Sequence, residues 1–484
     1  MSHIIPIGTV QKSHILEDKA LLSLNYNILK SGHGGIFGKS GSGKTYSLVS
    51  TLFSTIKSSI LQQSQPDNTK YGDTFVCIDP HNSFINPLLN LLGEYLIDNP
   101  KLSRYGDIFR FSNETIENNK KYRGFYMDKT FFFNPLFALS LVEDITDLNK
   151  WVNYNISSLK GVFNYSAFGP SNTKVLEGLI RSFIVINIER YHRDPDNVLL
   201  SYRDLYDLLD YTSRCQKLPT YLDEDRKKLF SSTHSDILQL ANGVDQELKT
   251  FLKDLQVDKQ SHITSLTKLK DFSFGLGDTF GYGKSYKELT LDIEHYMSGE
   301  KKQTEVYLFD FSVFNTQERR VVISFLTNIL YHIGAGKNHN NPNLGSHYYT
   351  CDEFQSFLEL QGSKNHMLDI LEKILNEHRK KKINMLFIFQ SISRELQDLL
   401  NNLSYSLIFA LPPEQAELFV PITNSGLEQK FAISEKDIVN LKRGEFYSVF
   451  DTINHGTLSI LTQSLNIGDQ NIQKLLKSNG EKYE

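Results

Sequence analysis

The stretch that decides the fold of this chain is Gly38-Lys39-Ser40-Gly41-Ser42-Gly43-Lys44-Thr45. It matches the phosphate-binding loop pattern G-x-x-x-x-G-K-[ST] at every fixed position. Its three glycines lack a Cβ atom, so the backbone can curl closely around phosphate oxygens and offer them its N–H groups. Lys44 can place a positive charge on the β and γ phosphates, and the Thr45 hydroxyl can hold Mg²⁺. We therefore expect all eight residues to bind ATP.

The flanking residues predict the strand and the helix that such a loop requires. Gly35-Ile36-Phe37 is typical of the end of a short buried strand. Beyond the loop, apolar residues recur at helical spacing, at Leu48, Val49, Leu52 and Ile56. A helix in this place directs its positive end at the bound anion. This context favours a nucleotide site over a chance run of glycine and serine.

Composition limits the other properties of the chain. Its 484 residues are enough for two or three domains, and 40% of them are hydrophobic. The 52 Lys and Arg and 56 Asp and Glu residues give a net charge of −4, so any DNA site must be a local channel or loop. Three widely spaced cysteines argue against a disulfide framework or a zinc site. We expect a cytoplasmic protein without a transmembrane segment, which a partner could recruit to a membrane.

Strands and helices alternate over most of the chain. Apolar strand-like runs lie at 74–79, 306–310, 348–351 and 385–389, and helical patterns lie at 322–333 and 367–381. This alternation predicts an α/β fold with a mainly parallel sheet flanked by helices. Residues 140–270 show helical periodicity throughout and predict an inserted all-α domain, which divides an ATPase core into 1–139 and 271–484.

Three further segments carry weaker structural signals. Residues 1–34 are expected to pack on the core, and 60–72 are expected to form a polar surface loop. Two short strands, 446–450 and 457–461, flank an Asn-His-Gly turn and predict a hairpin at the edge of the sheet.

An acidic pair, Asp352-Glu353, directly follows the strand at 348–351. The carboxyl ends of parallel strands meet at the edge where the phosphate-binding loop lies. Asp352 is therefore expected to hold Mg²⁺ and Glu353 to polarise the attacking water. The pair could instead only cap the next turn. Asp79 and Asp310 also end apolar strands, and we expect Asp79 near the nucleotide and Asp310 in a structural role.

Two more side chains are candidates for catalysis. Gln390 ends the strand after the acidic pair, where its carboxamide could bond the γ-phosphate or the water. The alternative is a simple strand-to-turn residue, and the context of the site favours the catalytic role. Arg379 lies in a basic run at 378–382, which charge alone explains as the solvated end of a helix. Arg379 could instead be an arginine finger for a neighbouring subunit.

The order of these motifs resembles that of the HerA/FtsK superfamily of P-loop ATPases, and in particular the type IV coupling proteins of conjugative DNA transfer (the TraG/TraD group). The matching stretches are His33-Gly34-Gly35-Ile36-Phe37-Gly38 (H-x-x-I-x-G), Ile78-Asp79-Pro80-His81 (D-P-H-G, with Asn82 for Gly), Phe133-Asn134-Pro135-Leu136 (F-N-P-L), Phe168-Gly169-Pro170 (W-G-P-R, with Ser171 for Arg), Asp352-Glu353-Phe354-Gln355, and Arg379-Lys380 followed by Gln390-Ser391.

The resemblance covers about 30 to 450 and implies a RecA-like core in a homohexameric ring that hydrolyses ATP to move DNA. It implies that Arg379 acts in trans, and that a secretion channel or a nuclease could be the partner. Membrane-bound coupling proteins have an N-terminal transmembrane pair and a strongly basic charge, and we expect neither feature in this protein. The run 379–384 is also similar to secretion ATPases that power pilus assembly, so protein cargo stays open. The chain could also be the ATPase partner of a defence nuclease, or a scaffold that binds nucleotide without turnover.

Overall fold

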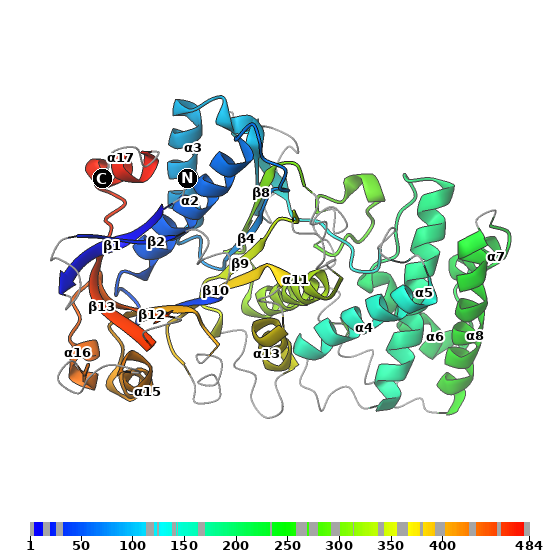
Figure 1. Ribbon diagram of the computed structural model, residues 1–484. Helices are drawn as coiled ribbons and strands as arrows, with labels where there is room; N and C mark the ends of the chain where they lie inside the picture. The colour runs from blue at the N-terminus through cyan, green and yellow to red at the C-terminus, as the bar shows by residue number, and fades with distance from the viewer. Residues whose placement is uncertain are drawn as a thin grey trace.

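One sheet of 13 strands organises the protein (Figure 1). The computed structural model describes residues 4–12, 20–25, 32–112, 121–122, 125–137, 142, 144–162, 170–232, 235–257, 269–270, 279–291, 301–312, 314–336, 343–355, 366–377, 381–392, 402–424, 432–452 and 456–478. The strand order is β2-β1-β13-β12-β11-β3-β10-β9-β4-β8-β5-β7-β6. The strands are β1 Ile4–Lys12, β2 Leu21–Asn25, β3 Gly34–Phe37, β4 Thr74–Asp79, β5 Gly106–Ser112, β6 Lys121–Tyr122, β7 Tyr126–Thr130, β8 Thr304–Asp310, β9 His347–Cys351, β10 Ile383–Phe389, β11 Tyr405–Phe409, β12 Glu445–Thr452 and β13 Gly456–Ser464.

The middle of the sheet is parallel, as the alternation of strands and helices predicts. Each strand in the series β11-β3-β10-β9-β4-β8-β5-β7 is parallel to its neighbours in the series, and β3 lies between β10 and β11. Every residue of β3, β4, β8, β9, β10 and β11 is buried. Such continuous apolar strands are typical of a sheet that helices cover on both faces.

Helices cover both faces of the sheet and also form a separate helical region beside it (Figure 1). They are α2 Lys44–Gln63, α3 Ile85–Asp98, α4 Ile145–Val162, α5 Pro170–Arg193, α6 Tyr202–Cys215, α7 Thr220–Phe230, α8 Ser235–Val257, α11 Thr316–Gly336, α13 His366–Glu377, α15 Pro413–Asn424, α16 Glu435–Val439 and α17 Gln470–Lys477, with short 3-10 turns at Leu102–Tyr105 and Tyr286–Glu288. Successive residues of β4 enter opposite layers, because side chains alternate along a strand. Phe75 and Cys77 pack with α2 and α3, whereas Val76 and Ile78 pack with α11 and α13.

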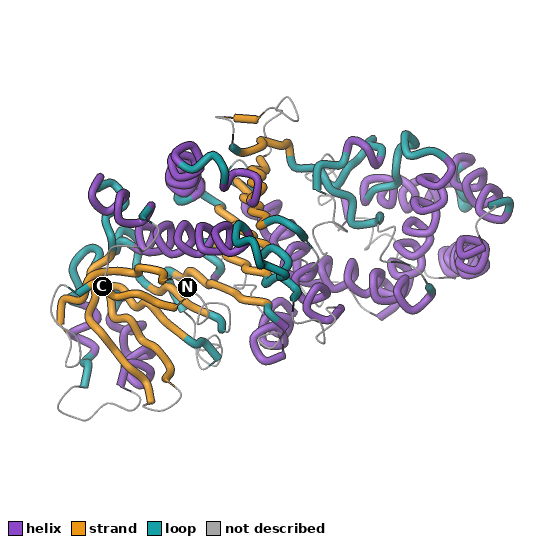
Figure 2. Tube along the Cα trace, turned by 45° about the horizontal axis from the view of Figure 1, so that its top comes forward, coloured by secondary structure: helices purple, strands orange, loops and turns teal. Residues whose placement is uncertain are grey.

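Helices α4 to α8 form the predicted helical insertion and lie to one side of the sheet, away from both termini (Figures 1 and 2). Helix α4 joins them to the core because it packs against α11. The Tyr154 hydroxyl of α4 donates a hydrogen bond to the Phe325 carbonyl of α11 at 2.8 Å. Residues 279–291 return to the insertion, where the Leu199 N–H donates to the Lys284 carbonyl. The exact division of the chain into domains stays a prediction.

The predicted hairpin forms, but its expected place at the sheet edge is wrong. Strand β13 pairs with β12 on one side and with β1 on the other, and β1 pairs with β2. The segment 1–34 therefore contributes two strands that extend the sheet. A polar surface loop is expected at 60–72, but helix α2 extends to Gln63, so the first residues of this range are helical. The helix predicted at 367–381 is described over His366–Glu377. No helix in the described part of the chain is long and apolar enough to cross a membrane.

Candidate active site

The phosphate-binding loop connects β3 to α2. Its first residues are tied to the two strands beside β3, because the Gly38 N–H donates to the Phe389 carbonyl at 3.1 Å and the Lys39 N–H donates to the Ala410 carbonyl at 2.9 Å. Gly43 has a φ of 105° and immediately precedes α2. A Cβ atom there would lie 2.9 Å from the Gly444 nitrogen, so only glycine fits. Backbone hydrogen bonds to the neighbouring strands therefore hold the loop at the amino end of a 20-residue helix.

Lys44 and Ser42 are suited to an anion. The Lys44 ammonium group is buried and donates to the carbonyls of Gly38 at 2.6 Å and Lys39 at 3.0 Å, across the loop. Burial lowers the pKa of Lys44, and the charges of Asp352 and Glu353 oppose that change. The Ser42 hydroxyl is buried without a hydrogen-bond partner among the described residues. A buried ammonium group beside an unsatisfied hydroxyl and a glycine-lined backbone fits a phosphate group. Thr45 lies half-buried in the first turn of α2.

Asp352 and Glu353 follow β9, and β10 separates β9 from β3. Both carboxylates are close enough to Lys44 to affect its pKa. Burial, and then the charge of Asp79, raise the pKa of Asp352. A divalent cation would relieve both effects, so this carboxylate fits the predicted Mg²⁺ ligand. Glu353 has a φ of 51°, which is uncommon outside glycine and occurs often at functional sites.

Gln390 and two residues that sequence reasoning missed contact the acidic pair. The Gln390 amide donates to Glu353 Oε1. His81 Nε2 lies 2.6 Å from Glu353 Oε2, and the Ser83 hydroxyl donates to Asp352 Oδ2 at 3.0 Å. A signal for them existed, because His81 and Ser83 follow strand β4. Strand β4 is the parallel neighbour of β9, so the turns after the two strands adjoin.

The other predicted acidic residues have structural partners. Asp79 is fully buried, and its carboxylate accepts hydrogen bonds from the N–H groups of Phe84 and Ile85 at 2.7 and 3.0 Å. It therefore caps the amino end of α3, although it lies at the expected edge of the sheet. Asp310 pairs with Arg110 at 2.8 Å. The predicted arginine finger, Arg379, lies outside the described residues.

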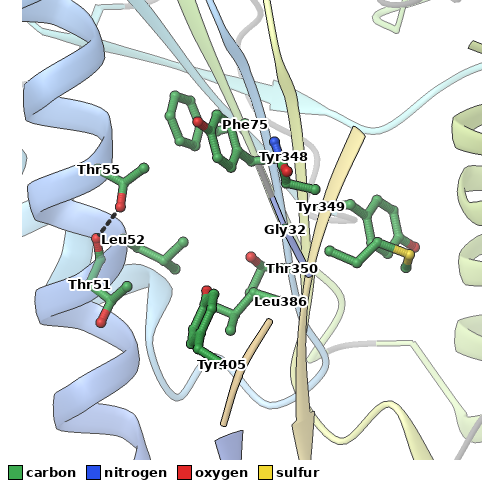
Figure 3. A pocket seen from close by; sticks show the side chains of 12 residues that line it. Gly32, Thr51, Leu52, Thr55, Phe75, Tyr348, Tyr349, Thr350, Leu386 and Tyr405 are labelled. Atoms are coloured by element: carbon green, nitrogen blue, oxygen red, sulfur yellow. Dashed lines mark hydrogen bonds between the residues drawn. The ribbon is translucent and has the colours of Figure 1, made fainter. Parts of the chain in front are cut away.

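A small pocket lies elsewhere, between α2 and the sheet (Figure 3). Phe75 and Tyr348 stack at its upper end with ring centroids 4.6 Å apart, and Thr51 and Thr55 line it from α2. Thr51 is about 10 Å along the helix axis from Lys44, at 1.5 Å per residue. None of the predicted site residues lines this pocket, so the nucleotide site and the pocket are separate.

Comparison with known proteins supports this architecture. No protein-family model matches the sequence, and no curated protein is similar to it at a significant level. A solved structure of VirB4 of Thermoanaerobacter pseudethanolicus superposes with a TM-score of 0.55 at 15% identity, over 95% of this chain and 96% of that chain. The chain has the fold of a RecA-like P-loop ATPase.

The plasmid coupling protein TrwB in complex with ADP and Mg²⁺ gives a TM-score of 0.49 at 13% identity, over 92% of this chain and 87% of that chain. The fold shared with VirB4 agrees with the RecA-like core that the sequence resemblance implies.

Proposed function

We propose that the protein hydrolyses ATP and uses the energy to move a polymer, with DNA as the cargo. One observation carries the proposal: at the carboxyl edge of a parallel sheet, Asp352 and Glu353 lie close enough to Lys44 to affect its pKa, beside a phosphate-binding loop in which position 43 has room only for glycine. This is the arrangement that phosphoryl transfer to water requires. The VirB4-like fold over nearly the whole chain supports a motor ATPase.

Each predicted residue then has a role that its position supports. The N–H groups of residues 38–45 and the Lys44 ammonium group bind the phosphates. Thr45 and Asp352 would hold Mg²⁺. The cation would offset the negative charge that develops on the phosphate oxygens during the reaction. Glu353 accepts the proton of the attacking water, and Gln390 orients the Glu353 carboxylate. These assignments together explain why two neighbouring strands end in polar side chains.

The proposed assembly is a cytoplasmic homohexameric ring in which Arg379 enters the site of a neighbouring subunit. DNA would contact local loops of the central channel, since the net charge of −4 does not suit a basic outer surface. A complementation experiment tests the shared site. Lys44→Ala and Arg379→Ala are each expected to lack ATPase activity, and mixing them is expected to restore part of it. Failure to restore activity in a mixed ring would contradict a site made from two subunits.

The decisive experiment measures the ATPase rate of the purified protein alone, with single-stranded DNA and with double-stranded DNA, alongside its mass in solution. DNA is expected to raise the rate, and Lys44→Ala is expected to abolish it. No activity above that of Lys44→Ala would refute the enzyme. Activity that DNA neither stimulates nor requires would favour a protein-moving secretion motor, and co-purification with a nuclease would favour the defence role.

A further inference from the structure

The turn between β4 and α3 contacts both residues of the catalytic acidic pair. In this turn, residues 79–84, the buried Asp79 carboxylate accepts hydrogen bonds from the N–H groups of His81 at 3.1 Å and Phe84 at 2.7 Å. Asn82, between the two residues that face the acidic pair, has a φ of 55°. A positive φ outside glycine persists only where the surroundings fix it. The Asp79 carboxylate thus joins the backbone near both ends of this turn.

From this turn, two side chains reach different members of the acidic pair. His81 Nε2 lies 2.6 Å from Glu353 Oε2, and the Ser83 hydroxyl donates to Asp352 Oδ2 at 3.0 Å. An ionised carboxylate only accepts hydrogen bonds, so Glu353 in its ionised form accepts a hydrogen bond from the Nε2–H tautomer of His81. These contacts join residues about 270 positions apart in the sequence, and they exist because β4 and β9 are parallel neighbours.

Glu353 is held from two sides. The Gln390 amide donates to its Oε1 and His81 donates to its Oε2, so both carboxylate oxygens have a donor on a separate strand end. The backbone of Glu353 is also in an uncommon conformation, with a positive φ of 51°. An ionised carboxylate accepts hydrogen bonds in its own plane, so two donors on different oxygens fix the orientation of that plane.

We propose that the turn 79–84 is the positioning element of the ATPase site, in which His81 orients the Glu353 carboxylate and Ser83 orients the Asp352 carboxylate. The inference rests on the proposed ATPase function. His81 affects the chemical step, because Glu353 acts on water and the phosphate-binding loop binds ATP independently. Ser83 affects metal binding, because the member of the acidic pair that it contacts is the proposed Mg²⁺ ligand. The two side chains therefore have separable kinetic effects.

The test for His81 compares three substitutions in the full-length protein. His81→Ala is expected to lower kcat about hundredfold, with KM for ATP unchanged, since misplacement of a catalytic group by about 1 Å has such an effect. His81→Gln is expected to restore most of the rate, because its amide nitrogen can take the position of Nε2. His81→Asn is similar in polarity but too short, so it is expected to remain slow. Equal rates for the glutamine and asparagine variants would overturn the role of His81.

The test for Ser83 measures Mg²⁺ dependence. Ser83→Ala is expected to raise the Mg²⁺ concentration for half-maximal ATPase by about ten- to hundredfold, the usual effect of losing a group that orients a metal ligand. Mg²⁺ is also expected to increase the affinity for a fluorescent ATP analogue less in this variant than in wild type. This binding measurement does not depend on turnover. Ser83→Thr keeps the hydroxyl and is expected to behave as wild type. Unchanged Mg²⁺ dependence in Ser83→Ala would overturn the role of Ser83.

Matched controls separate these outcomes from general damage. His192→Ala and Ser103→Ala change the same residue types at exposed positions in other elements, α5 and the 3-10 turn Leu102–Tyr105, and are expected to retain wild-type kinetics. The midpoint of thermal unfolding is measured for every variant. If the wild type has no ATPase activity that Lys44→Ala removes, the proposed function fails and the roles of the turn fail with it. If the wild type is active and the variants match it, only the positioning inference fails.

Discussion

The close approach between the phosphate-binding loop and the loop before β12 gives the most direct test of the site's construction. Gly43 and Gly41 both have positive φ angles, of 105° and 75°. Their surroundings differ. A Cβ atom on Gly43 would lie 2.9 Å from the nitrogen and 3.0 Å from the Cα of Gly444, whereas a Cβ atom on Gly41 would meet no atom within 4 Å. Alanine at the two positions therefore separates the backbone cost from the steric cost.

The expected magnitudes follow from these two terms. A positive φ costs an alanine about 1–2 kcal/mol, and this applies to both substitutions. Gly43→Ala adds an overpacking cost of about 1–3 kcal/mol, because the obstructing atoms are backbone. Gly444 cannot yield easily, since its N–H donates to the Ser42 carbonyl and its carbonyl accepts from the Ser464 N–H, both at 2.8 Å. We therefore expect a free-energy loss of about 1–2 kcal/mol for Gly41→Ala and about 2–5 kcal/mol for Gly43→Ala.

Urea unfolding followed by circular dichroism, without nucleotide, measures both losses relative to wild type. Leaving nucleotide out matters because a Cβ atom at position 41 could also obstruct a phosphate group. The reasoning is refuted if Gly43→Ala unfolds at the same urea concentration as Gly41→Ala. That result would mean that the loop before β12 moves away at no cost and does not hold the phosphate-binding loop in shape.

Three other predictions follow from the described contacts. Burial lowers the pKa of Lys57 from 10.5 to about 8. Between these pH values Lys57 is protonated in the unfolded chain and neutral in the folded protein. The free energy of unfolding should therefore rise with pH in this window, by up to about 3 kcal/mol. Urea unfolding at pH 7.5 to 10.5 should show this rise in wild type but not in Lys57→Met, and parallel curves would contradict it. Asp225 accepts a 2.5 Å hydrogen bond from Arg190 at a buried site in the insertion. Asp225→Ala should therefore lower unfolding free energy by about 3–5 kcal/mol, and an unchanged urea midpoint would exclude this. Glu353→Gln should lower kcat about 10²- to 10⁴-fold while ATP still binds, whereas Lys44→Ala should lose binding; an active Glu353→Gln would remove Glu353 from catalysis.

The central fold could be predicted because its signals are local. Continuous apolar strands, helical periodicity and the loop at 38–45 each specify their own structure, and the described strands and helices of the core overlap the predicted ranges. The edge of the sheet could not be predicted in the same way. Strand β1 pairs with β13, for example Gly8 with Ser464, and nothing near residue 8 encodes a partner more than 450 residues away. Pairing of distant strands depends on the whole topology.

In the candidate site too, local sequence signals identify residues, whereas the contacts between those residues depend on the whole fold. The sequence identified four candidates. Lys44 belongs to the phosphate-binding loop motif, and Asp352, Glu353 and Gln390 are polar residues directly after apolar strands. Their contacts with His81 depend on which strands are neighbours in the sheet, and that order is a property of the three-dimensional fold. Asp79 shows the limit of the strand-end rule, since its carboxylate is used by the backbone of the following turn.

Burial disfavours charges of both signs at this site, which bears on how substrate and metal bind. It lowers the pKa of Lys44 and raises the pKa of Asp352, and the attraction between the two groups offsets only part of the cost for Lys44. A phosphate chain supplies negative charge to Lys44 but repels Asp352, whereas a divalent cation does the reverse. Only the two together compensate both groups at once. This balance supports the proposal that the site binds the metal–nucleotide complex, and the Ser83 hydroxyl contacts the carboxylate that is the proposed metal ligand.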